Sequence, residues 1–288
     1  MGPEDSEALA AREVTDVERD DRVLPLTRIV SAAIVPFLVL AFAVLYIRPD
    51  DTGRLFAWTI HPRLTPMILG AVYLGGAYFF VLAARAHEWH TIKAGFPPVT
   101  AFATLMGIAT VLHWEKFSHH HVAFWLWVAL YFTTPFLVFG VWLANRRTET
   151  PADPGEPMVP GVVATVIGTV GVLACLTSLF VFLDPTRAIS IWPWLLTPLT
   201  ARVMAAIFAL GCSAVGAFTE RRWSCLRIML QVEVVMLALI LIGVLRAHDD
   251  LDGGRPLTWA FGIGFLAVLL VSIGLYARTT TATSTAQA

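Results

Sequence analysis

The sequence predicts an all-α, polytopic membrane protein with eight transmembrane helices, arranged as two tandem four-helix repeats. Three observations lead to this prediction. The chain of 288 residues is 57% hydrophobic and 14% charged, with a mean hydropathy of +0.71, which lies outside the range of soluble domains. Its apolar residues gather in eight long runs. The second half of the chain also resembles the first half in sequence.

Each apolar run is long enough to cross a bilayer as a helix. A hydrocarbon core of about 30 Å needs about 20 helical residues that rise about 1.5 Å each. We expect spans at residues 29–47, 64–84, 96–113, 122–144, 160–183, 197–218, 226–246 and 256–277. The runs are continuously apolar and about twice the length of a barrel strand, which excludes a membrane β-barrel.

The spans set the expected domain boundaries. The first four-helix repeat is predicted at 28–147 and the second at 160–278, joined by a linker at 148–159 that is rich in proline and acidic residues. Residues 1–27 mix acidic residues with arginines and lack an apolar core, so they are not a signal peptide. We expect 1–27 and 279–288 to be disordered tails, the first of them cytoplasmic.

Internal repetition is the strongest signal after hydropathy. A shift of about 135 residues superposes the two halves, and Pro49 and Trp58 then match Pro185 and Trp194 in spacing. A unit of four spans keeps its orientation when it is duplicated, so the two halves should be related by an axis along the membrane normal. An aromatic segment before the second span of each half is too short to cross the bilayer, and it should lie along the interface or fold back onto the bundle.

The second span of each half begins near a Thr-Pro pair. Thr65 and Thr197 are expected to cap the free amides, because the following proline suits the first helical turn. In the sixth span, small residues recur at every fourth position, which favours close packing against a neighbouring helix; they are Ala205, Ala209, Ser213 and Ala217.

Basic residues predict the orientation. Twelve Arg and Lys residues fall on the side of both termini and eight on the opposite side. The positive-inside rule therefore predicts a bacterial cytoplasmic membrane protein with both termini in the cytoplasm. Tryptophans are expected at the headgroup level at the ends of the spans; those on the outer side are Trp58, Trp114, Trp125, Trp127, Trp192, Trp194 and Trp259.

Three cysteines, Cys175, Cys212 and Cys225, lie in or beside apolar runs without C-x-x-C spacing. The sequence therefore predicts neither a disulfide framework nor a zinc knuckle. We expect three small side chains buried in lipid.

The stretch HWEKFSHHH supplies the candidate metal ligands, which are His113, Glu115, His119, His120 and His121. A first-row metal accepts imidazole, and these groups could converge if the outer loop folded back on itself. Successive residues of a helix point about 100° apart, so the triplet alone cannot aim three rings at one ion. The alternative interpretation is polar decoration of the membrane interface. The sequence identifies no cofactor.

Intramembrane polar residues supply the second candidate site. Glu233 lies six residues beyond Arg227, or about 9 Å along a helix, and therefore within hydrocarbon. A carboxylate there should face the bundle, pair with another group or stay protonated. Gln231 is two residues away and lies on a different face.

Two arginines near the outer surface complete the substrate or coupling candidates. Arg202 is expected to snorkel outward or to pair with an outer aspartate, one of Asp184, Asp249 and Asp250. With Arg246 nearby, an outer vestibule would be mildly basic.

The segment FAWTIHPRLTPMILGAVY and its counterpart WPWLLTPLTARVMAAI resemble uncharacterised bacterial integral membrane proteins with eight spans. That resemblance covers most of the chain and implies no activity. The four-plus-four layout is also similar in outline to haem A synthases, which use histidines inside helices of each half and an outer cysteine pair. This sequence has neither feature, so that family is set aside.

Transport of a small molecule or ion is the function the sequence favours, because of the duplication and the intramembrane Glu233. The alternatives are a membrane redox, metal or haem protein that uses the outer histidines, and a non-catalytic assembly subunit. No soluble catalytic motif is present, which disfavours an enzyme. The chain is not basic enough to bind nucleic acid, and its expected partner is the lipid bilayer, with a homo-oligomer or a membrane complex left open.

Overall fold

The computed structural model describes residues 20–152 and 155–285, and their side chains as far as residue 278. In this part of the chain, eight helices are long and apolar enough to cross a membrane, and no β-strand forms. The prediction of an all-α, multi-pass membrane protein is confirmed.

The eight spans lie close to the predicted ranges. They are α2 (Pro25–Phe42) with its π-helical continuation η1 (Ala43–Ile47), α4 (Leu64–Arg85), α5 (Phe96–Leu112), α6 (Val122–Asn145), α7 (Gly161–Leu183), α9 (Pro198–Ala209) with its 3-10 continuation η6 (Leu210–Phe218), α10 (Trp223–Arg246) and α11 (Pro256–Thr285). Short helices occupy the connections; they are η2 (Pro49–Asp51), α3 (Thr52–Leu55), η3 (Lys93–Gly95), η4 (Trp114–Lys116), η5 (Arg146–Thr148), α8 (Pro185–Ile191) and η7 (His248–Asp250).

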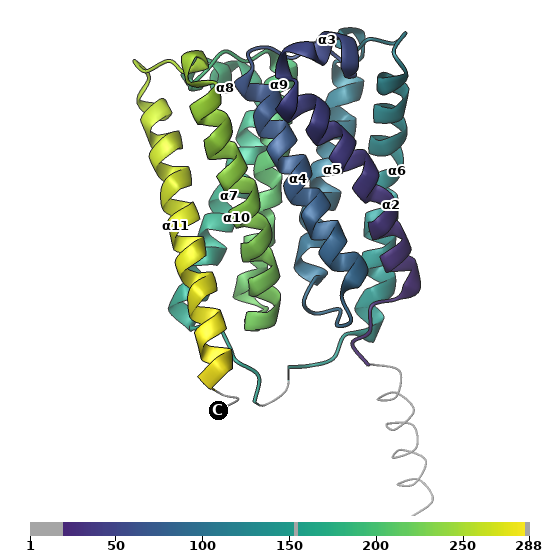
Figure 1. The fold of residues 1–288 in the computed structure, drawn as a ribbon, viewed down its shortest axis with the longest axis vertical. Coiled ribbons are helices and arrows are strands. Elements are labelled where there is room, and N and C mark those ends of the chain that lie inside the picture. The colour runs from purple at the N-terminus through teal and green to yellow at the C-terminus, as the bar shows by residue number, and fades with distance from the viewer. Residues whose placement is uncertain (1–19, 153–154, 286–288) are drawn as a thin grey trace, which may run out of the picture.

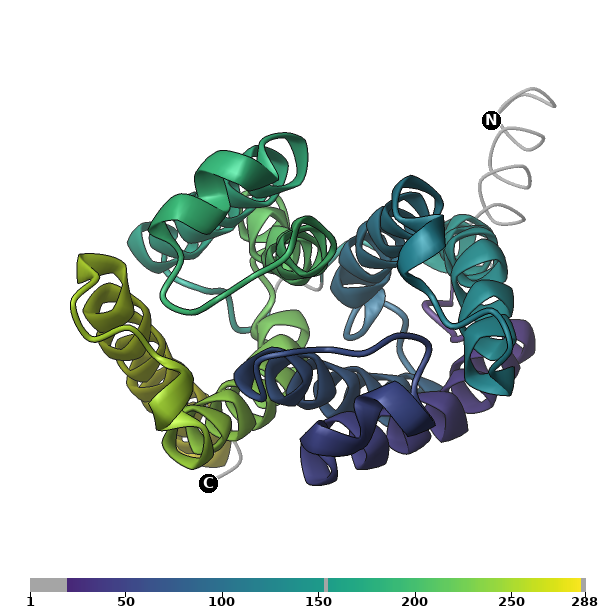
Figure 2. The ribbon, with the colours of Figure 1, turned by 90° about the horizontal axis from the view of Figure 1, so that it is seen from above.

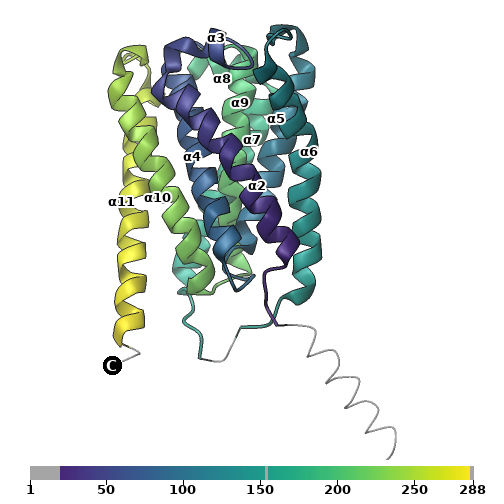
Figure 3. The same cartoon turned by 45° about the vertical axis from the view of Figure 1, so that its right-hand side comes forward.

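The start of α2 and the end of α11 lie at the same end of the bundle, which we call the terminal end (Figure 1). The short helices α3 and α8 cover the opposite end, called the distal end here (Figure 3). This placement follows from an even number of crossings.

The helices form two groups that lie side by side (Figure 2). In the first group α2 packs on α4 and α5 on α6; in the second α7 packs on α9 and η6, and α10 on α11. Across the interface between the groups, α4 packs on α10 and α5 on α9. The order of packing is thus the same in both halves, although the tandem duplication itself stays a prediction. One contact differs: α2 also packs on α6, whereas α7 and α11 lack comparable packing within the described residues.

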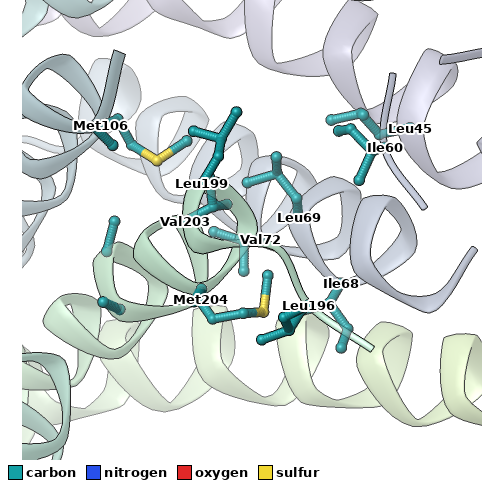
Figure 4. Packing of buried hydrophobic residues seen from close by; sticks show 14 of the residues in the cluster. Leu45, Ile60, Ile68, Leu69, Val72, Met106, Leu196, Leu199, Val203 and Met204 are labelled. Atoms are coloured by element: carbon teal, nitrogen blue, oxygen red, sulfur yellow. The ribbon is translucent and has the colours of Figure 1, made fainter. Parts of the chain in front are cut away.

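Apolar side chains fill the distal half of the interface between the groups (Figure 4). Leu69 and Val72 of α4 lie in this buried cluster with Leu199 and Val203 of α9. Because lipid is as apolar as these side chains, close packing and not the exclusion of water stabilises such a contact. We call the cluster the apolar plug; it consists of Leu69, Val72, Met106, Leu199, Val203 and Met204.

The two aromatic segments fold back over the distal end of the bundle, which is one of the two arrangements expected for them. Trp58 and Trp194 are 3% and 2% exposed, so they are buried caps and not interfacial anchors. Trp194 Nε1 donates a hydrogen bond to Thr65 Oγ1 at 2.9 Å and so joins the two halves. The expected capping role of Thr65 is therefore wrong, because α4 already begins at Leu64. The cap by Thr197 is confirmed by its contact with the Thr200 amide at 3.2 Å.

The described parts of the two predicted tails, residues 20–27 and 279–285, have regular or packed structure. Helix α2 begins at Pro25, and Leu24 just before it donates its amide to Asn145 Oδ1 at 3.0 Å. Val23 is buried, so residues 20–24 pack against the bundle instead of belonging to a disordered tail. At the other end, 279–285 continue α11. Residues 1–19 and 286–288 of the predicted tails lie outside the described residues.

Helix α7 and η6 lie close enough for a disulfide to form between them, which the sequence did not predict. A Cβ added at Gly171 would lie 2.6 Å from the Val215 amide nitrogen, which shows that the two backbones nearly touch. Cys175 and Cys212 consequently have Cα atoms 5.7 Å apart and form a disulfide. The expectation that no disulfide forms is wrong for this pair, while Cys225 is free and buried as expected.

Candidate functional site in a cavity between the halves

A cavity of about 420 Å³ lies in the terminal half of the bundle, between the two groups of helices. Its walls come from α4, α5, α7, η6, α10 and α11. Pockets of about 300–1,000 Å³ are typical of small-molecule sites. The cavity is therefore large enough to hold a ligand.

Glu233 of α10 was expected to face the bundle, to pair or to stay protonated, and its side chain lies in the wall of this cavity. Its Oε2 accepts a hydrogen bond from Ser272 Oγ of α11 at 2.9 Å. Within the described part of the chain, Glu233 forms no ion pair. The carboxyl group thus faces a space with one hydroxyl partner and no basic side chain.

The 3-10 segment η6 forms one wall. The α-helix ends at Ala209, and nine residues with 3-10 hydrogen bonding complete the span. Non-α backbone at membrane depth is tolerated where it is packed in protein or lines a cavity. The small-residue stripe predicted for helix packing is divided here: Ala205 and Ala209 are buried, whereas Ser213 and Ala217 line the cavity.

The cavity reaches the lipid-facing surface between α7 and α11. Val166 and Val170 of α7 line the cavity and are 58% and 49% exposed, and Val271 of α11 is 61% exposed. Side chains that belong to both the cavity wall and the outer surface mark a lateral opening. A ligand could therefore enter from the bilayer.

Four charged residues close the terminal end, and we call them the ionic network: Lys93, Glu149, Glu220 and Arg222. Lys93 pairs with Glu149, and its Nζ lies 2.6 Å from Glu220 Oε2. The guanidinium of Arg222 donates two hydrogen bonds to Glu220, at 2.9 and 2.6 Å. Glu220 also lines the cavity, so the network forms its terminal boundary.

The electrostatics of Glu220 show how strongly the ionic network is coupled. Burial alone would raise the pKa of this carboxyl, but hydrogen bonds from Arg222 and Lys93 outweigh burial and lower the pKa from 4.5 to about 2. Glu220 is therefore ionised at neutral pH, and its negative charge is paired with the positive charges of Lys93 and Arg222.

A second polar cluster lies beside the ionic network. His90 Nδ1 is 2.5 Å from Asp21 Oδ2, and His90 Nε2 is 2.9 Å from Ser224 Oγ. Ser224 donates to Glu156 Oε1 at 2.8 Å. These contacts join the chain before α2, the α4–α5 connection, the linker and α10. Neither terminal cluster was predicted from the sequence, although the acidic residues of the linker and the basic residues on this side were signals that pointed to it.

The other substrate candidates do not share the cavity. Gln231 donates to the Tyr276 hydroxyl at 2.9 Å and accepts from the Tyr78 hydroxyl at 3.4 Å, which ties α10 to α11 and α4. Arg246 donates to the Tyr46 carbonyl at 3.1 Å at the distal end. The structure therefore separates these residues from Glu233.

Arg202 pairs with a histidine and not with an outer aspartate. Its guanidinium donates to His113 Nε2 at 2.7 Å, which joins the two halves at the distal end. Burial, followed by the charges of Arg202 and Lys116, lowers the pKa of His113. The imidazole is therefore a neutral acceptor, with its proton on Nδ1. The expected pairing with Asp184, Asp249 or Asp250 is wrong.

The five candidate metal ligands are not brought together. Apart from His113, which contacts Arg202, His119 Nε2 lies 3.0 Å from the Trp114 carbonyl oxygen, and Glu115 is exposed. In the described ranges, no three His, Cys, Asp or Glu side chains are placed to share one ion. The structure gives no support to this metal site, which stays a prediction.

A smaller cavity of about 130 Å³ lies within the first half. Its wall is almost wholly apolar and aromatic, and the hydroxyls of Tyr73 and Tyr131 there are 2.5 Å apart. One of these hydroxyls donates to the other, so a single hydrogen bond joins α4 to α6 at this cavity.

Comparison with known protein families, with characterised proteins and with solved structures finds no match to this chain.

Proposed function

We propose that this protein is a membrane transporter for small molecules and that the cavity with Glu233 is its substrate site. The observation that carries the proposal is the placement of an intramembrane carboxyl in a cavity of about 420 Å³ between the two halves. The apolar plug lies on its distal side and the ionic network on its terminal side. A site at the interface of two similar halves, bounded on both sides, suits alternating access.

The energetic cost of Glu233 supports a functional role. A carboxylate in hydrocarbon costs at least about 2.5 kcal/mol on insertion scales. A structural carboxyl usually recovers such a cost through ion pairs, yet Glu233 has Ser272 as its hydrogen-bond donor. A group that is costly and only partly satisfied is expected where a proton or ligand binds.

The ionic network and the apolar plug, which bound the cavity on its two sides, would open by different movements. Opening the terminal side requires the separation of Lys93 and Arg222 from Glu220, and water can solvate those charges once they separate. Opening the distal side requires α4 to move away from α9 across the apolar plug. We place the terminal end in the cytoplasm, because basic residues accumulate there.

Thiol labelling tests the proposal without knowledge of the substrate. Cys225 lines the cavity next to the ionic network and is a free cysteine. In sealed vesicles of known orientation, a membrane-impermeant maleimide added on the terminal side should label Cys225. In a Cys225→Ala background, Ala267→Cys in the cavity wall should be labelled from the distal side.

Leu270→Cys in the same background is the matched control, because Leu270 lies on the same helix and is 59% exposed to lipid. It should stay unlabelled by a water-soluble reagent. Labelling of both cavity positions from their respective sides supports alternating access. If neither cavity position reacts in vesicles while both react after denaturation, the cavity never meets water and the transport proposal fails.

A further inference from the structure

The walls of the cavity define the charge of the ligand, provided that the transport proposal holds. Glu233 and Glu220 are the charged side chains in the described lining. Glu220 is already paired with Lys93 and Arg222, whereas Glu233 has no basic partner. An anion would meet an unpaired carboxyl in a medium of low dielectric constant, so the site disfavours it. A cation would supply the missing partner.

The rest of the lining defines the body of the ligand. Apart from the two carboxyls, the polar side chains in the wall are Ser213, Ser272 and Cys225. The other lining residues are glycine, alanine, proline and larger apolar residues, with Met229 and Met236 among them. Methionine side chains adapt to ligands of different shape. An apolar body bearing one positive charge matches this surface.

The lateral opening between α7 and α11 gives such a ligand a route. Val170 and Val271 face both the cavity and the lipid. Hydrophobic cations accumulate in the bilayer, so the opening faces the phase in which they are concentrated. A strongly hydrated ion such as Na⁺ would gain nothing from this entrance, and the wall provides few oxygen ligands for it.

We propose that the cavity binds hydrophobic organic monocations in exchange for one proton on Glu233. In the empty cavity the carboxyl carries a proton, because the described lining residues of α4, α5, α7, η6, α10 and α11 include no basic side chain. When the cation binds, the carboxyl O–H bond breaks, the proton leaves to water and the carboxylate pairs with the cation. Charge is conserved, since one positive charge enters and one leaves. Glu220 and Cys225 are the other titratable groups of the wall, and Glu220 stays ionised in the ionic network.

Binding of tetraphenylphosphonium to the purified full-length protein in detergent tests this exchange. Equilibrium dialysis measures the binding, and a pH indicator in weak buffer measures the protons released. We expect saturable binding with one proton released for each cation bound. Tetraphenylborate has the same shape and the opposite charge, and it should not bind to the cavity.

Two variants assign the exchange to this carboxyl. Glu233→Gln keeps the shape of the side chain and should abolish both the proton release and the saturable binding. Ser272→Ala removes the hydrogen bond to the carboxylate and should weaken binding about tenfold. Glu115→Gln makes the same chemical change at an exposed distal position and should leave both quantities unchanged.

The outcomes separate this inference from the transport proposal. Equal binding of the borate, or unchanged binding and proton release in Glu233→Gln, overturns the inference. The inference is also overturned if the unmodified protein binds no cation, while Cys225 in that protein and the new thiol in the Cys225→Ala, Ala267→Cys variant are labelled from opposite sides. That outcome leaves the transport proposal standing. Absence of both binding and labelling overturns the two together.

Discussion

The ionic network makes a pH-dependent contribution to stability that a single substitution should remove. Glu220 accepts three hydrogen bonds from Arg222, two from the guanidinium and one from the backbone amide. It also pairs with Lys93, and its side chain is 16% exposed. Glu220→Gln removes the negative charge and keeps the shape. Lys93 and Arg222 still contact Glu149 in the variant, so the network should loosen without disappearing.

The magnitude follows from the lowered pKa. A decrease from 4.5 to about 2 corresponds to about 3 kcal/mol at about 1.4 kcal/mol per pKa unit. Solvent at the terminal surface screens part of the interaction, which leaves roughly 2 kcal/mol. Because the pKa in the folded protein is the lower one, this stabilisation is present above pH 4.5 and is lost as the pH falls towards 2.

Thermal unfolding in detergent, followed at several pH values, checks this expectation. At pH 7 Glu220→Gln should unfold at a lower temperature than the unmodified protein, and the difference should shrink as the pH falls below 4.5. Glu115→Gln, an exposed carboxyl at the distal end, should show no such difference. The variant should also label faster at Cys225 from the terminal side, because the boundary of the cavity is weakened. A difference in stability that does not depend on pH would refute the electrostatic reasoning.

Three further substitutions test other parts of the structure. Asn145→Leu removes four hydrogen bonds of a fully buried side chain and should cost about 3 kcal/mol, measured by denaturant unfolding in detergent; a loss below about 1 kcal/mol would contradict the bonding described. Arg202→Leu should raise the pKa of His113 towards 6.5, because one of the charges that lower it is gone, and an NMR titration of the imidazole would show no change if the pairing is absent. As the pH falls below 6.5, the Arg202→Leu variant should lose less stability than the unmodified protein. The reason is that the pKa of His113 in the folded variant lies closer to its value in the unfolded chain. Gly171→Leu should push α7 away from η6, since even a Cβ there lies 2.6 Å from the Val215 amide nitrogen, and thiol counting after denaturation should then find more than one free cysteine per chain.

The spans could be predicted because lipid imposes a simple rule on sequence. Backbone polar groups in hydrocarbon must be satisfied within the segment, so a long apolar run has few alternatives to a helix. The predicted span 64–84 differs from α4 by one residue at its end. The depth of a residue in the membrane also follows from its position within a span, which is why Glu233 could be placed in the hydrocarbon from the sequence. Its cavity could not be predicted, since volume depends on how six separate segments pack.

The contacts that bound the cavity and those that join the two halves depend on pairs of residues far apart in the chain. Lys93 and Glu220 are joined across the two halves, as are His113 and Arg202. No periodicity encodes such pairs. Arg202 was expected to snorkel outward or to pair with an outer aspartate, because a cation in the membrane usually seeks water or an anion. In the structure its guanidinium contacts a neutral imidazole acceptor instead.

The two halves share an order of packing and differ in how they are filled, and this difference decides where a ligand can bind. The first half encloses about 130 Å³ among aromatic rings, including Phe102 and Trp127, and α2 closes it against α6. The larger cavity of about 420 Å³ extends into the second half, where glycine, alanine and valine of α7 and η6 replace such rings. A carboxyl at the level of Glu233 can reach a ligand only where such space exists. The cavity between the halves therefore extends towards the second half and its lipid-facing opening. Under the proposed function, a ligand that entered from the bilayer would meet Glu233 before the apolar plug.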